Sequence, residues 1–283
     1  MSTKHLDFET VKVPVENRRS NITLFMIMMG FTFFSASMWA GQTLAAGLDF
    51  RGFVWALILG GIILGTYTGT LGFIGAESGL SLDLLAQRSF GRKGSWLPSA
   101  MISFTQTGWF GVGLAMFAIP VVKEIFNIPV SPDSMPWQGY ALVALAGVLM
   151  TASAFFGIKS LTLISYIAVP LVAILGTTAM IMAVKQGDRT LIEQFSVGTK
   201  NLSVIAAAGL VIGSFVSGGT ATPNFTRFGK KGISAAIITV LAFFIGNSLM
   251  FFFGAVSSIY VGGNDIFEVM LNLNLFWFAI IVL

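Results

Sequence analysis

The sequence contains no cysteine and only one histidine among its 283 residues. The absence of cysteine excludes disulfides, zinc–thiolate sites and a thiol nucleophile. The one histidine, His5, lies in the polar N-terminal segment, so the rest of the chain has no imidazole to act as a metal ligand or as an acid/base catalyst.

Charged residues are also scarce. They make up 10% of the chain, against about 25% in soluble domains, whereas 55% of the residues are hydrophobic and 27 are Phe. Long apolar runs, each near the roughly 20 residues that a helix needs to cross a bilayer, follow one another along the chain. We therefore predict an all-α integral membrane protein.

Seven apolar stretches are long enough to span a membrane. They cover residues 21–48, 52–76, 96–122, 139–156, 161–184, 202–222 and 233–256. Segment 258–274 is expected to form a short surface helix, and a further apolar run at 275–283 is too short to cross. We therefore expect a polar tail at 1–20 and a transmembrane transporter domain at 21–283 that is cut within an eighth span.

Lys and Arg are distributed unequally between the two sides of these spans. Of the 16 basic residues, 11 fall on the side of the N-terminus and five on the other. Because cytoplasmic loops carry an excess of basic residues, we expect a cytoplasmic N-terminus. Topology then accounts for the net charge of +4, and no nucleic-acid partner is expected.

Two of the spans are interrupted by weak helix formers. Residues 30–48 read GFTFFSASMWAGQTLAAGL, and residues 209–223 read GLVIGSFVSGGTATP. Such breaks are tolerated at membrane depth only where protein or a polar cavity satisfies the freed backbone groups. The alternative is an unbroken helix whose small residues allow close helix contact. The first and sixth spans are five apart, as expected for two inverted five-helix repeats with broken first helices.

The predicted spans contain no Asp, Glu, Lys or Arg. Since charged cargoes and proton relays usually require such residues, we expect a neutral ligand. Gln106 and Trp109 are three residues apart and share a helix face, where an amide and a ring face suit a flat ligand with a hydrogen-bonding edge. The alternative is that Gln106 bonds to a neighbouring helix and Trp109 only packs.

The same residue inventory disfavours two other classes of membrane protein. An intramembrane enzyme would need a nucleophile and a base or a metal set, and the spans lack His, Cys, Asp and Glu. A channel would be expected to show rings of like charge or a repeated filter motif. We therefore expect neither an enzyme nor a channel.

Four segments together resemble a known family. They read FTFFSASMWAGQTL, LLAQRSFGRKGSWLPS, TQTGWFGVGLAMFAIP and GSFVSGGT…FTRFG. They are similar to the bacterial cytosine permeases of the nucleobase–cation symporter-1 family, the purine-cytosine permease type. The resemblance implies a leucine-transporter-type inverted-repeat bundle with broken helices 1 and 6, in which spans 1, 3, 6 and 8 surround the nucleobase.

The resemblance also implies a set of substrate-binding residues. They are Phe34, Gln106, Trp109, Ser214, Phe215 and Ser217. In this picture Trp109 and Phe215 sandwich the pyrimidine ring and Gln106 bonds to its edge. The two serines and the backbone near Phe34 add polar contacts.

For the coupling ion, the resemblance implies sodium bound by the backbone carbonyls of Gly30 and Phe33 and by side chains of span 8. The implied function is sodium symport of a neutral nucleobase, cytosine first, by alternating access. The alternative is a proton-coupled permease for another purine, pyrimidine or hydantoin-like heterocycle. We expect no cofactor beyond the ion, a monomer, and a location in the bacterial inner membrane.

Overall fold

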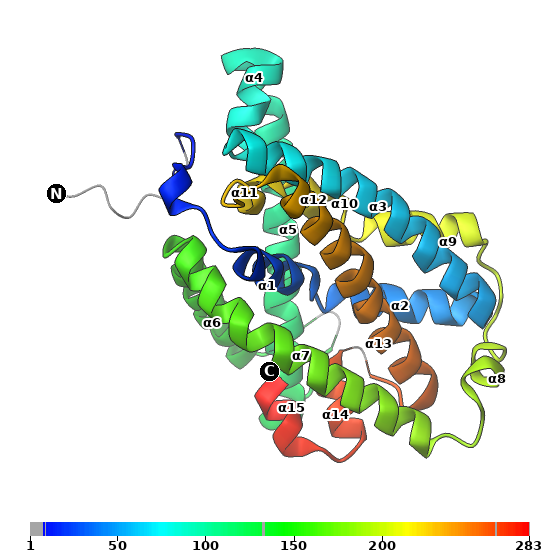
Figure 1. The fold of residues 1–283 in the computed structure, drawn as a ribbon. Coiled ribbons are helices and arrows are strands. Elements are labelled where there is room, and N and C mark those ends of the chain that lie inside the picture. The colour runs from blue at the N-terminus through cyan, green and yellow to red at the C-terminus, as the bar shows by residue number, and fades with distance from the viewer. Residues whose placement is uncertain (1–7, 9, 132–133, 264, 283) are drawn as a thin grey trace.

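The computed structural model describes residues 8, 10–131, 134–263 and 265–282 (Figure 1). Of the expected tail 1–20, residues 1–7 and 9 lie outside the described residues, and His5 is among them. Almost all of the described chain with regular structure is helical, with isolated β-bridges between Arg19 and Gly229 and between Ser131 and Ser134. The predicted all-α class is confirmed.

The helices follow one another with short connections. In chain order they are η1 (Val15–Asn17), α1 (Asn21–Thr32), α2 (Ala36–Gly47), α3 (Phe50–Ser78), α4 (Leu82–Gly94), α5 (Trp96–Pro120), η2 (Val121–Ile125), α6 (Trp137–Phe155), α7 (Ile158–Gln186), α8 (Leu191–Phe195), α9 (Val204–Gly213), α10 (Val216–Thr220), α11 (Pro223–Thr226), α12 (Gly232–Leu241), η3 (Ala242–Gly246), α13 (Asn247–Tyr260), α14 (Ile266–Asn272) and α15 (Phe276–Val282). The elements η2 and η3 are π-helical and continue α5 and α12.

These helices supply the spans that the sequence predicts. Within the described residues, five helical stretches are long and apolar enough to cross a membrane: 50–78, 96–125, 137–155, 158–186 and 232–260. Two further spans are bent pairs, α1 with α2 at 57° and α9 with α10–α11 at 51°. Counting each bent pair as one span gives seven, and the breaks fall in the first and sixth, as predicted.

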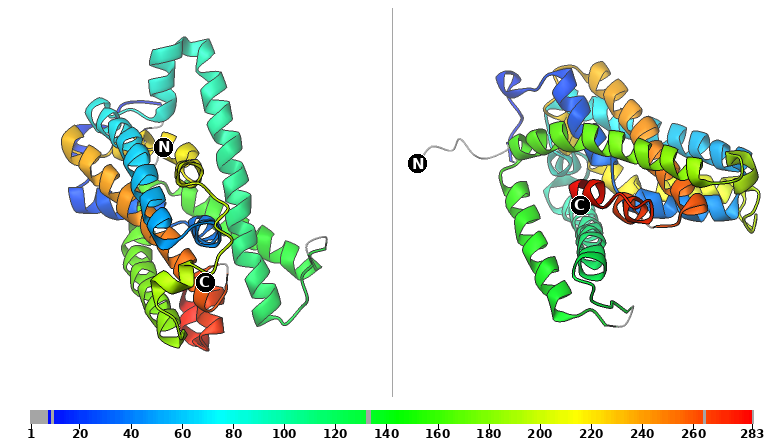
Figure 2. Two further views of the ribbon diagram at one scale, coloured as in Figure 1. Left: turned by 90° about the vertical axis from the view of Figure 1, so that its right-hand side faces the viewer. Right: turned by 90° about the horizontal axis from the view of Figure 1, so that it is seen from below.

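The helices form a slanted bundle from which one hairpin extends. In the bundle, α13 packs on α2, α12 and α9 pack on α3, and α7 packs on α1 (Figure 1). The antiparallel pair of α4 and α5 stands apart from this layer, and α4 projects beyond it (Figure 2). Helix α5 meets the sixth span mainly at α10, and its Trp109 contacts Phe34 at the break of the first span.

Small residues bring two helices of the bundle into direct backbone contact. A Cβ atom on Gly41 of α2 would overlap the carbonyl oxygen of Phe251 in α13, and one on Gly254 of α13 would overlap that of Met38 in α2. The two interpretations of the first span therefore both apply. The span is broken before Ala36, and beyond the break its small residues make a close helix contact.

The predicted surface helix in segment 258–274 is correct as a helix but wrong as a surface element. Helix α14 buries Ile266, Phe267, Val269 and Met270 in a cluster that includes Met38 of α2. Its apolar face therefore belongs to the core, because it packs on α7 and α13 and against Met38 of α2.

Candidate functional site

The first span changes direction at Phe33–Ser35. The Phe34 N–H donates to the Thr32 carbonyl at 2.9 Å, where a continuous helix would use the Gly30 carbonyl. Phe33 has φ −80° and ψ 71°, outside the helical region. The Gly30 and Phe33 backbones therefore lie at a point where the regular hydrogen-bond ladder is interrupted.

The sixth span changes direction at Ser214–Phe215. Phe215 has φ −135° and ψ 0°, and its N–H bonds to the Ile212 carbonyl at 3.2 Å. The Phe215 side chain is nevertheless buried, because it packs edge-on against Phe31 and Phe243 with ring centroids 5.3 Å apart in each pair. The break thus fixes the position of this ring.

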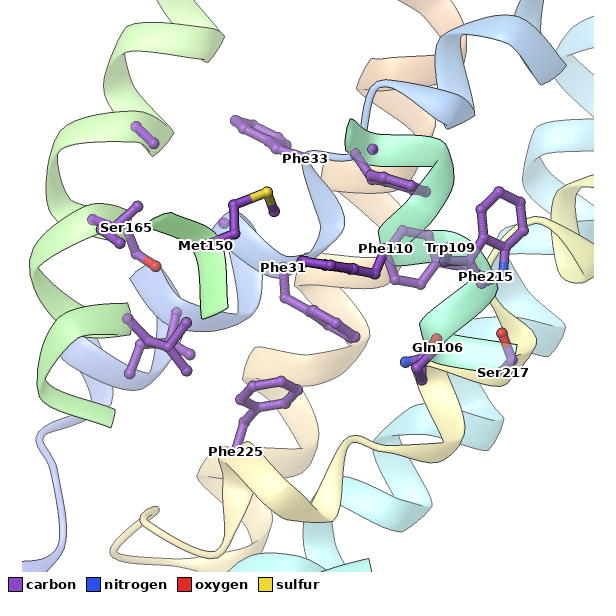
Figure 3. A pocket seen from close by; sticks show the side chains of 18 of the residues that line it. Phe31, Phe33, Gln106, Trp109, Phe110, Met150, Ser165, Phe215, Ser217 and Phe225 are labelled. Carbon is purple, nitrogen blue, oxygen red and sulfur yellow. The ribbon is translucent and has the colours of Figure 1, made fainter. Parts of the chain in front are cut away.

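A cavity of about 410 Å³ lies between the two breaks (Figure 3). Its walls come from α1 and the following break, from α5, α6 and α7, and from the break between α9 and α10 together with α10 and α11. All eight residues named from the sequence line this cavity: Gly30, Phe33, Phe34, Gln106, Trp109, Ser214, Phe215 and Ser217. The structure brings them together, and their individual roles stay predictions.

Aromatic rings surround part of the cavity at right angles to one another. Phe34 contacts Trp109 at 5.6 Å and an interplanar angle of 83°, and it contacts Phe215 at 6.3 Å and 86°. Edge-to-face contacts of this kind are favourable and directional. The predicted sandwich residues, Trp109 and Phe215, are therefore linked through one intermediate ring, Phe34.

Two polar side chains of the cavity, those of Gln106 and Ser217, have no partner within the protein among the described residues. Figure 3 shows both on the same side of the cavity, Gln106 on α5 and Ser217 on α10, and these two helices are in contact. Within the described part of the chain, neither side chain makes a hydrogen bond, so their donors and acceptors are free for a ligand. Ser214 differs, because its hydroxyl donates to the Val211 carbonyl at 2.8 Å and retains only acceptor capacity.

Comparison with known proteins assigns the chain to a family. Residues 12–283 match the family described as permeases for cytosine/purines, uracil, thiamine and allantoin. The chain belongs to this permease family. Cytosine permeases of Escherichia coli strains K12, CFT073 and O157:H7 are each 45% identical over 277 residues, which cover 98% of this chain. The chain spans 64% of the length of these relatives.

Solved structures show the same fold. Mhp1, a nucleobase-cation-symport-1 family transporter in a closed conformation with bromovinylhydantoin bound, has a TM-score of 0.80 at 17% identity, covering 98% of this chain and 64% of Mhp1. The inward-facing conformation of Mhp1 has a TM-score of 0.73 at 16% identity, covering 100% of this chain and 63% of Mhp1. The predicted leucine-transporter-type fold is confirmed, and the relatives are transporters, in agreement with the prediction that the chain is not an enzyme.

The permease cavity also contains a polar residue that the sequence did not indicate. Ser165 of α7 is buried and lies on the wall opposite Gln106 and Ser217 (Figure 3). A Cβ on Gly30 would come within 2.8 Å of its Oγ, so glycine permits the close approach of α1 and α7. No sequence signal could identify this residue, because contact between the first and fifth spans depends on the fold.

The cation predicted in this permease would have to be held by neutral oxygens. Among the described residues, no group of three or more His, Asp or Glu side chains is placed to bind a metal ion. Backbone carbonyls at an unwound helix are suitable ligands for sodium in transporters, and the interrupted backbone at Gly30 and Phe33 is of this kind. The residues present therefore fit the ion in chemical type.

Proposed function

We propose that the protein is a secondary active transporter that imports a neutral nucleobase, cytosine first, by sodium symport and alternating access. The observation that carries this proposal is the cavity between two broken helices, which combines orthogonal aromatic rings with the unpaired side chains of Gln106 and Ser217. We further propose that it works in the bacterial inner membrane with a cytoplasmic N-terminus.

The chemistry of the cavity favours a flat, uncharged, polar-edged ligand. Aromatic side chains stack on any nucleobase, whatever its ring substituents. In nucleic-acid-binding proteins this stacking contributes about 1–3 kcal/mol of binding free energy per base. A Gln amide supplies both a donor and an acceptor in one plane, which matches the edge of a pyrimidine. The similarity to curated cytosine permeases supports cytosine among such ligands.

Sodium is favoured over the proton as coupling ion by the lining of the cavity. Among the described residues, the lining contains aromatic, aliphatic, methionine, glycine, serine and glutamine residues and no Asp, Glu, His or Lys. A proton relay usually runs through such titratable groups, whereas interrupted backbone carbonyls coordinate sodium directly. Proton coupling would therefore need a titratable group from outside this lining.

Uptake by proteoliposomes that contain the full-length protein tests the proposal. Radiolabelled cytosine should accumulate when an inward sodium gradient is imposed at equal pH on both sides. Unlabelled cytosine should compete better than uracil or hydantoin. Uptake driven equally by a proton gradient without sodium would instead establish the proton-coupled alternative, and the absence of any cytosine uptake would contradict the substrate.

A further inference from the structure

The N-terminal segment crosses one end of the bundle and is tied to it by backbone hydrogen bonds. We call residues 8 and 10–20 the N-terminal strap. The Val13 N–H donates to the Gly79 carbonyl at 2.9 Å, just past α3, and the Arg19 N–H donates to the Phe228 carbonyl at 2.6 Å, just past α11. The strap therefore joins the ends of the second and sixth spans (Figure 1).

Arg18 reinforces this junction with its side chain. Its Nη1 donates to the Ala76 carbonyl of α3 at 2.7 Å and to the Gly229 carbonyl at 3.0 Å. The C-terminal carbonyls of a helix carry partial negative charge, so a guanidinium is a favourable partner for them. One side chain of the strap thereby connects α3 with the loop that follows the sixth span.

Arg227, which directly follows α11, binds the strap from the side of the sixth span. Its Nη1 donates to the Phe8 carbonyl at 2.9 Å, and its Nε donates to the Asn224 carbonyl at 3.1 Å. The side chain is buried, and its guanidinium carbon lies 5.0 Å from the centre of the Phe228 ring. The strap thus donates a hydrogen bond to the end of the sixth span through Arg18, and the end of the sixth span donates one to the strap through Arg227.

The strap also packs against the wall of the cavity. Val13 is fully buried in a cluster with Ile27, Ile158 and Phe228, against which Phe225 packs. Ile27 and Phe225 are at the same time lining residues of the cavity, and Figure 3 shows Phe225 at one end of it. Detaching the strap would therefore uncover the outer side of residues whose inner side faces the cavity.

We propose that the N-terminal strap is a latch that closes the cavity on the N-terminal side and must release each time the cavity opens to that side. Arg18 is a positioning residue in this latch, because it is not one of the residues that line the cavity. The latch rests on the proposed function for its place in a transport cycle, but the contacts that hold the strap on the bundle do not depend on that function.

The latch can be tested by cysteine labelling, because the sequence has no native cysteine. The reporter is Ile27→Cys, which is almost fully buried at the junction of cavity and strap. An impermeant maleimide is added to inside-out vesicles, which expose the proposed cytoplasmic side. Arg18→Met in the reporter background should raise the labelling rate roughly tenfold or more, since one hydrogen bond to a charged group shifts an equilibrium by about this factor.

Two further variants and a control make the result specific. Arg18→Lys retains a cation that reaches the carbonyls and should label at an intermediate rate, and Val13→Ala, which loosens the apolar side of the strap, should also label faster. Arg51→Met removes an exposed cation at the other end of α3 and should leave the rate unchanged. Unchanged labelling in Arg18→Met and Val13→Ala, or equal acceleration by Arg51→Met, would overturn the latch.

Cytosine binding is measured separately on the same vesicles. A parent protein that fails to bind cytosine would contradict the proposed function and leave the labelling test of closure intact. If Arg18→Met does not fold, Arg18→Lys and Val13→Ala decide the question alone, and their labelling at the parent rate would overturn the latch.

Discussion

Trp109 and Phe215 are the two residues predicted to stack on the base. Replacing either with Ala should weaken cytosine binding roughly 5- to 150-fold, because stacking on a base is worth about 1–3 kcal/mol. Trp109→Phe keeps a ring face and should lose much less. Isothermal titration of the purified protein measures the effect, with Phe90→Ala, an exposed ring on α4, as the control. Normal affinity in both folded alanine variants would exclude the sandwich.

Gln106 should act on selectivity rather than on affinity alone. A ligand whose donor and acceptor pattern is reversed leaves buried polar groups unpaired, at about 1–3 kcal/mol each. Gln106→Leu should therefore weaken cytosine binding and reduce the preference for cytosine over uracil. Competition binding with both bases measures this ratio. An equal loss for every ligand, or no loss, would assign Gln106 a structural role.

Asp265, which lies outside the membrane spans, makes the stability of the α14 segment depend on pH. Burial raises the pKa of Asp265 to about 6, although its Oδ1 accepts the Glu268 N–H at 2.9 Å as the N-cap of α14. The negative charge of Glu268 raises the pKa further. Because the folded pKa lies above the ordinary value of about 3.9, the α14 segment is most stable below about pH 4 and loses stability as the pH rises through 6.

Asp265→Asn should remove this pH dependence. The amide oxygen can still cap α14, so the variant should protect the α14 amides better than the parent at pH 7.5, by up to about 3 kcal/mol, and equally at pH 4. Hydrogen exchange at the two pH values, corrected for intrinsic rates, measures the difference. Protection that is lower in the variant at pH 7.5 would show that the charged form is the stabilising one.

At the scale of elements, the contact between α2 and α13 depends on glycine. Gly41→Ala or Gly254→Ala would place a methyl group against a backbone carbonyl of the other helix, which cannot move as a side chain can. We expect destabilisation of about 1–3 kcal/mol, seen as a lower midpoint of thermal unfolding in detergent. Gly209→Ala in α9 meets no atom within 4 Å and should be neutral or slightly stabilising. Similar midpoints for all three variants would contradict this close contact.

The elements also show which features the sequence could predict. The breaks before Ala36 and Val216 were predictable because Gly and Ser cluster there in otherwise apolar spans. The burial of α14 was not predictable, because the same apolar sequence is compatible with a face on lipid and with a face packed on α7 and α13. Nor was Ser165, since a single serine in an apolar helix has no local signal for a partner in the first span.

For the whole molecule, the inverted-repeat fold explains why residues from the first, third and sixth spans share one cavity. The sequence predicted this grouping only through the spacing of two broken spans and through family resemblance, and the fold places all eight named residues in the cavity wall. The position of α5 beside both breaks depends on how the helices pack together and has no counterpart in the local sequence.

The central claim is that this cavity binds a nucleobase together with sodium, and one titration tests it most directly. Cytosine is titrated into the full-length protein at constant pH and ionic strength, with sodium exchanged for potassium. Binding should be roughly 5- to 150-fold tighter in sodium, the usual range of coupling between two sites, and Trp109→Ala should weaken it in both salts. Equal affinity in sodium and potassium, or binding that ignores Trp109→Ala, would contradict it.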